Sequence, residues 1–137
     1  MEGRNGSWCV ELMTVFSTWV QSEPGQGYVR NAARPIVTTQ GGTSYTFALT
    51  DANTMVRFSA ATAVAATIPP NASVAFDTGT VLYIEQGGAG TVTFTAGAGV
   101  TLEFPSVLTA ETLDQYALAS ALKRDTNTWV LSGRLGG

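Results

Sequence analysis

The chain has 137 residues, which suits one domain, and 45% of them are hydrophobic. Charged residues make up only 12%, about half the usual share, and the net charge is −3 with no cluster of lysine or arginine. Nucleic-acid binding requires a clustered positive surface, so the composition argues against it. A weakly charged surface favours a subunit covered by other chains over the alternative, a free monomer with a surface of Thr, Ser, Asn and Gly.

Residues 1–40 are predicted to form an N-terminal interaction arm ahead of a β domain at 41–137. Apolar residues in the stretch 8–20 recur at helical spacing, but its β-branched residues and the alternation at its start favour a strand, so both states stay open. Residues 22–40, with several prolines and glycines, are predicted to form an extended connector. We expect the arm to reach a neighbouring chain, the alternative being that it folds back on its own domain.

Alternating apolar and polar residues predict three strands at the start of the domain, at 44–49, 54–59 and 64–68. The turn-forming residues at 50–53 join the first two strands into a hairpin. Pro69 and Pro70 end the third strand, because proline has no N–H for a strand ladder.

Residues 79–104 are predicted to be a three-stranded antiparallel meander. Leu82 and Ile84 mark the buried face of the first strand, and Val92 and Phe94 mark that of the second. Glycine turns at 87–90 and 97–99 reverse the chain, since glycine accepts the positive φ that such turns often need. We interpret these glycines as hairpin turns because a β-solenoid needs more repeats at a fixed period.

Two further strands end the chain, at 115–123 and 128–133, with a turn at 125–127 between them. The alanines of the stretch 115–123 also permit a helix. About eight short strands separated by turn residues predict an all-β fold, an antiparallel β-sandwich or jelly-roll-like domain.

Reactive chemistry is sparse in this sequence. It has no histidine and a single cysteine, Cys9, so triads, thiolate clusters and most transition-metal sites are excluded. Glu85 and Glu103, expected on adjacent strands, are the one conceivable carboxylate pair, and we interpret them as solvated surface residues. The two Asp-x-Asn pairs, at 51–53 and 125–127, are interpreted as turns. We therefore predict no enzyme activity, no catalytic residue, no cofactor and no metal.

Membrane insertion is also not expected. No apolar run approaches the roughly 20 residues that span a bilayer. The N-terminal apolar stretch is interrupted by Glu11 and lacks a clear cleavage pattern, so we expect no signal peptide and synthesis in a cytoplasm.

Four features follow one another in residues 67–135: a Pro-Pro-Asn stop, a Gly-Thr strand ending at Gln86, a Gly-Ala-Gly hairpin, and a closing Asn-Thr-Trp-Val-Leu-Ser-Gly. In this order they resemble a small β domain that recurs in virion proteins of tailed bacteriophages, including capsid cement proteins, tail fibres and other appendages. The resemblance covers about half the chain and leaves out residues 1–40. It implies a structural role in a virion, often as a trimer, and supplies no catalytic residues.

The sequence and the resemblance together predict a capsid decoration protein on the virion surface. We expect a homotrimer that binds the major capsid protein through large apolar side chains of the arm, since such anchors dominate interface energies. These partner-interface residues are Trp8, Leu12, Phe16 and Trp19. The alternative is a tail fibre or appendage domain that presents the loops near Gly87, Gly97 and Pro105 to a host glycan. The small residues of these loops offer little stacking area, which favours the first interpretation.

Overall fold

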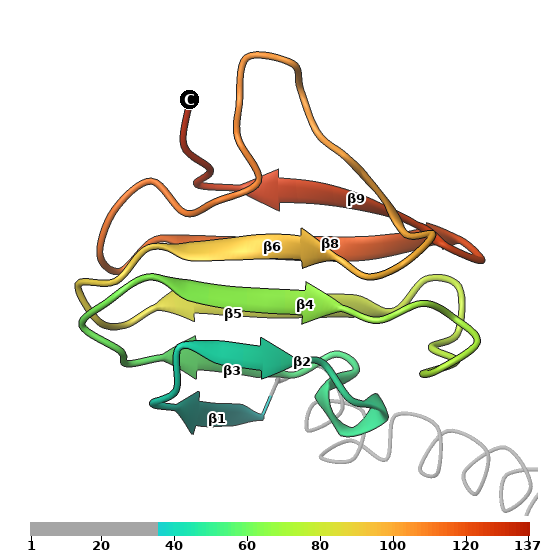
Figure 1. The fold of residues 1–137 in the computed structure, drawn as a ribbon, viewed down its shortest axis with the longest axis horizontal. Helices are drawn as coiled ribbons and strands as arrows, with labels where there is room; N and C mark the ends of the chain where they lie inside the picture. The colour runs from blue at the N-terminus through green and yellow to red at the C-terminus, as the bar shows by residue number, and fades with distance from the viewer. Residues whose placement is uncertain (1–35) are drawn as a thin grey trace, which may run out of the picture. The chain divides into compact units, whose positions relative to one another are not determined.

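The computed structural model describes residues 36–137, which contain nine strands and one short 3₁₀ helix (Figure 1). In chain order these elements are β1 (Val37–Gln40), β2 (Ser44–Thr46), η1 (Leu49–Asp51), β3 (Met55–Phe58), β4 (Val64–Ile68), β5 (Val81–Gln86), β6 (Val92–Ala96), β7 (Thr101–Glu103), β8 (Leu118–Asp125) and β9 (Thr128–Gly133). The prediction of an all-β fold is confirmed for this part of the chain.

The strands form two sheets, and the chain alternates between them from β1 to β6. One sheet has six strands in the order β1-β3-β5-β8-β9-β7, and the other has three in the order β2-β4-β6. Each of the first four strands pairs in parallel with the strand two places later. Figure 1 shows the three-stranded sheet lying in front of β3, β5 and β8. The chain therefore winds in stacked coils, which is the path of a β-solenoid.

This winding overturns the predicted antiparallel arrangement. Among the described residues, five of the seven strand pairings are parallel. The predicted hairpin at 44–59 is wrong, because β2 and β3 belong to different sheets. The predicted meander at 79–104 is wrong for the same reason, since β6 lies in the opposite sheet from β5 and β7. A glycine turn reverses the chain equally well within one sheet or between two.

The coils differ in length, and for this reason no fixed period is visible in the sequence. On the larger sheet Val37 pairs with Met55, which pairs in turn with Tyr83, so the second coil contains a longer stretch of chain than the first. The smaller sheet shows the same change, because β6 follows β4 at a greater distance in sequence than β4 follows β2. Unequal coils of this kind leave no periodic signal in the residues.

The coil stack ends in an antiparallel pair. β8 pairs antiparallel with β5 and with β9, so the predicted strands around the turn at 125–127 are confirmed as a hairpin. β7 adds to the far side of β9 in parallel. On the smaller sheet, the outer edge of β6 is covered by an antiparallel bridge between Thr93 and Glu111.

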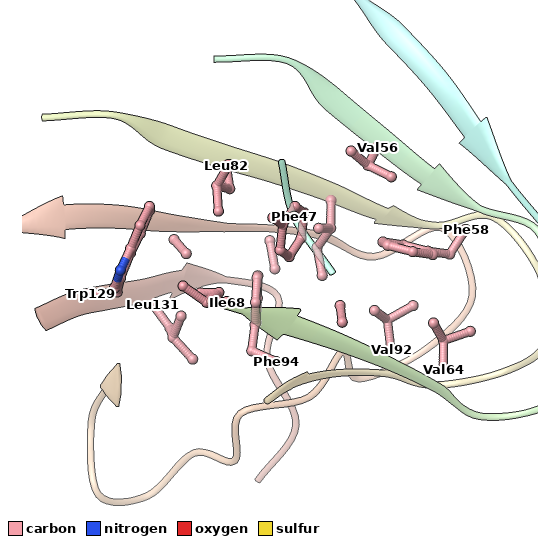
Figure 2. Close-up of a cluster of buried hydrophobic side chains, with 14 of the residues drawn as sticks. Phe47, Val56, Phe58, Val64, Ile68, Leu82, Val92, Phe94, Trp129 and Leu131 are labelled. Atoms are coloured by element: carbon pink, nitrogen blue, oxygen red, sulfur yellow. The ribbon is translucent and has the colours of Figure 1, made fainter. Parts of the chain in front are cut away.

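One hydrophobic core fills the space between the two sheets (Figure 2). The predicted inward positions on four strands, β3, β5, β6 and β9, are confirmed as buried: Val56, Phe58, Leu82, Ile84, Val92, Phe94, Trp129 and Leu131. β8 contributes its small residues to this core, because Ala119 and Ala121 are buried while Leu118 and Leu122 are 53% and 41% exposed. The larger side chains of β8 therefore face solvent.

Close stacking of the turns explains two of the glycines. A Cβ atom on Gly88 would overlap the carbonyl oxygen of Ala60, and one on Gly90 would overlap that of Thr62, in the turn of the preceding coil. The expected positive φ is absent here and occurs instead at Gly99, with φ 78°. Glycine at the turn 87–90 is thus required by the close approach of two backbones.

Two networks of buried polar groups connect segments that are distant in the sequence. Thr112 donates to the side-chain oxygen of Gln86 and accepts from the N–H of Val92 at 2.9 Å, with Gln86 and Thr112 each 2% exposed. Elsewhere Lys123, also 2% exposed, donates from Nζ to Asn71 Oδ1 at 2.5 Å and to the Phe76 carbonyl at 2.6 Å. Each network satisfies groups that would be costly to bury unpaired.

Candidate interaction surface

The four predicted partner-interface residues, Trp8, Leu12, Phe16 and Trp19, all lie outside the described residues. The predicted boundary between arm and domain at residue 40 falls inside the described part. There, residues 37–40 form β1 and pair with β3, so they belong to the folded domain.

Apolar side chains gather on the solvent side of the six-stranded sheet, which we call the outer face. Strand register places two rows of side chains beside one another there. One row joins Val81, Leu122 and Val130 across β5, β8 and β9. The other joins Met55 and Tyr83, which face Ser120 on β8. Since an exposed apolar patch is a common mark of a protein–protein contact, this face is the candidate site.

A shallow hollow interrupts the outer face where its small residues meet. It has a volume of about 210 Å³ and is lined by Met55, Tyr83, Leu118, Ala119, Ser120 and Gly133. Gly133 has a positive φ of 107° and packs against the backbone of β8, so no side chain can fill this place. The hollow is large enough for one apolar side chain of a partner.

Ion pairs flank the apolar rows on the same face. Arg57 on β3 lies 3.4 Å from Glu85 on β5, and Arg124 on β8 lies 2.5 Å from Glu103 on β7. Both pairs are solvent-exposed enough to add little stability. An apolar centre with a charged rim is the usual anatomy of a protein interface.

The two glutamates of these ion pairs do not form the conceivable carboxylate site. Glu85 and Glu103 were expected on adjacent strands, but β8 and β9 lie between β5 and β7, so that expectation is wrong. Asp114 is held by Arg134 in two hydrogen bonds of 2.9 and 3.0 Å, and this partner keeps the pKa of the Asp114 carboxyl below its usual value. Within residues 36–137 no group of three or more His, Cys, Asp or Glu residues is placed to hold a metal ion.

Two of the three loops proposed for glycan binding, those near Gly87 and Gly97, do not lie on one surface. β5 and β6 lie in opposite sheets and run in opposite directions, so the turns that follow them lie at opposite ends of the domain (Figure 1). The N–H of Gly87 donates to the Phe58 carbonyl, whereas the N–H of Gly97 donates to the Ile68 carbonyl. A site built from both turns is therefore excluded by their separation.

No family model, curated protein or solved structure matches this chain. None of the helices in residues 36–137 is long and apolar enough to cross a bilayer.

Proposed function

We propose that this chain is a bacteriophage virion structural protein, a capsid decoration protein that binds and stabilises the lattice of the major capsid protein, as a homotrimer. The observation that carries the proposal is the outer face, where Leu118 and Leu122 remain 53% and 41% exposed beside an apolar hollow. The bacteriophage assignment itself comes from the resemblance of residues 67–135 to virion β domains.

The composition supports a role that depends on contact. Contact with water is less favourable in free energy for a weakly charged, apolar sheet surface than contact with another protein. The outer face and the arm would then act together, the face as a broad contact and the arm as an anchor. Repetition over a symmetric shell multiplies such contacts, since tethered sites bind with high effective concentration.

The outer face is tested by substituting both leucines in the full chain. Leu118→Ser with Leu122→Ser is expected to weaken binding to assembled capsids about tenfold or more, since central interface residues cost more than about 1 kcal/mol each. Val107→Ser is the matched control, because Val107 is 77% exposed and lies in a loop outside this face. Equal binding by the leucine and control variants would remove the outer face from the proposal.

The arm is tested separately. Replacement of Trp8, Leu12, Phe16 and Trp19 by serine leaves β1 intact, which a deletion of residues 1–40 would not. Weakened capsid binding supports the arm as an anchor, and unchanged binding removes it from the mechanism.

The second candidate is a tail fibre or other appendage domain. The specific observation in its favour is the coil winding, because β-solenoid coils extend by stacking along one axis. The number of copies in purified particles separates the two candidates. Hundreds of copies per particle indicate decoration of the shell, and a few copies to a few dozen indicate an appendage.

A further inference from the structure

The coil stack has an open end at its first coil. β1 and β2 are the outermost strands of their sheets, so each lacks a neighbour on one side among the described residues (Figure 1). Their sequences, VTTQ and SYT, contain no charge and no proline. Proteins usually protect an edge strand with such residues, because its free backbone groups pair readily with another strand.

The hydrogen bonds of β1 define which of its backbone groups are free. The Ile36 carbonyl accepts from Met55, and the Gln40 carbonyl accepts from Ser59, both at 2.8 Å. In a parallel ladder alternate residues face the partner strand, so even-numbered residues of β1 face β3. Val37 and Thr39 therefore direct their N–H and C=O groups away from the sheet.

The same strand carries an unsatisfied hydroxyl group. Thr38 lies opposite the buried Val56, and its Oγ1 atom is buried with no hydrogen-bond partner. A buried hydroxyl without a partner is unfavourable and rare in folded proteins. Because this oxygen has almost no accessible surface, a neighbouring chain could reach it only if the Thr38 side chain turned toward the edge.

We propose that β1 pairs antiparallel with β1 of a second copy of this chain, across a two-fold axis centred on Thr38. Val37 of one copy then exchanges two backbone hydrogen bonds with Thr39 of the other. The two Thr38 residues become a directly opposed pair.

A second copy fits this edge because it presents the same pair of edges. A two-fold axis along the normal of the two sheets reverses the strand direction and the stacking direction together. It places β1 beside the second β1 and β2 beside the second β2, and it leaves each sheet in its own layer. Self-complementarity of this kind is the requirement of a closed dimer interface. The contact does not depend on the proposed function, and combined with a threefold assembly it gives six chains.

Cysteine cross-linking tests the register. In the full chain with Cys9→Ser, Thr38→Cys is expected to form a disulfide-linked dimer on mild oxidation. Opposed residues of this kind have Cα atoms about 4.5 Å apart, within the span of about 4.4 to 6.8 Å that a disulfide allows. Gln40→Cys is the control, because Gln40 faces the same side but would lie about 13 Å along the strand from its equivalent. Cross-linking of Thr38→Cys alone supports the proposal, and cross-linking of neither variant or of both equally overturns it.

Charge repulsion tests the contact without a cross-link. Val37→Lys with Thr39→Lys places like charges opposite one another across the axis, which destabilises a strand pair. Light scattering over a concentration series should show half as many chains per particle as in the wild type, with an unchanged circular dichroism spectrum. Thr101→Lys with Ser106→Lys adds the same charge outside this edge and should leave the number of chains unchanged. A wild-type particle with one or three chains overturns the proposal.

Discussion

The hydrogen bonds of Thr112 provide a direct test of the packing described above, because they join the end of β5, the start of β6 and the segment around residue 112. The perturbation is Thr112→Val, which keeps the shape of the side chain and removes its hydroxyl group. The Val92 N–H, now bonded at 2.9 Å, and the side-chain oxygen of Gln86 then lose their partner in a buried site. An unsatisfied buried group costs about 1 to 3 kcal/mol, so we expect a loss of about 2 to 4 kcal/mol.

The assay is thermal and urea unfolding of the full chain followed by circular dichroism. A loss of this size lowers Tm by about 10 to 20 °C in a domain of about 100 residues. Thr112→Ser is the matched control, because it keeps the hydroxyl and loses one methyl group, worth about 0.8 kcal/mol. A Thr112→Val protein that is as stable as the Thr112→Ser protein would refute the reasoning. A double-mutant cycle with Gln86→Leu measures the coupling between the two side chains directly.

Three further predictions concern stability. Gly90→Ala should destabilise the protein more than Gly79→Ala. A Cβ at position 90 overlaps a backbone carbonyl, whereas a Cβ at position 79 meets open space and is opposed only by the positive φ of 95°. Equal urea midpoints for the two variants would contradict this. Burial, followed by the hydrogen bond to its carboxylate partner, raises the pKa of Tyr45 to about 12. Deprotonation is therefore harder in the folded state, and the stabilisation is complete below the ordinary tyrosine pKa of about 10 and lost as the pH rises to about 12. Tyr45→Phe should flatten this part of the pH profile of unfolding, and an unchanged profile would show that another group is responsible. Ala121→Leu should cost about 1 to 3 kcal/mol by overpacking, whereas Leu122→Ser should change stability by less than about 0.5 kcal/mol; the reverse order would mean that the faces of β8 are assigned incorrectly.

Most strand positions were predictable because β3, β4, β5, β6, β8 and β9 each bury one face. Leu82 and Ile84 alternate with polar or half-exposed neighbours, and this period survives whatever the strand pairs with. β8 shows the limit of the rule. Its alternation was recognisable, but hydrophobicity alone favours the leucines for the core. The close packing of β8 against the opposite sheet instead selects alanine at the buried positions.

Topology was not predictable from the same signals. A turn rich in glycine is compatible with a hairpin and with a passage between sheets, and only long-range pairing decides between them. The unequal lengths of the coils conceal the repeat that would have indicated a solenoid. Glycine at 88 and 90 is required by the close approach of two backbones. In a sequence, however, a glycine can equally indicate a positive φ, so these two causes could not be told apart.

The candidate site was the least predictable part. The sequence indicated Trp8, Leu12, Phe16 and Trp19, which lie outside the described residues. The outer face is assembled from β3, β5, β8 and β9, so no single stretch of sequence contains it. Exposed leucines on β8 were the available clue, and recognising them required knowledge of which face is buried.

The insertion of β8 between β5 and β9 has a consequence for biosynthesis. The ribosome releases the six alternating strands first, and their larger sheet then ends at β5 with an unpaired edge until β8 arrives. An emerging chain is thus vulnerable to aggregation for the time needed to translate the segment that separates β5 from the end of β8. Rare codons after residue 90 would lengthen this interval, and a chaperone that shields sheet edges would be needed most during it.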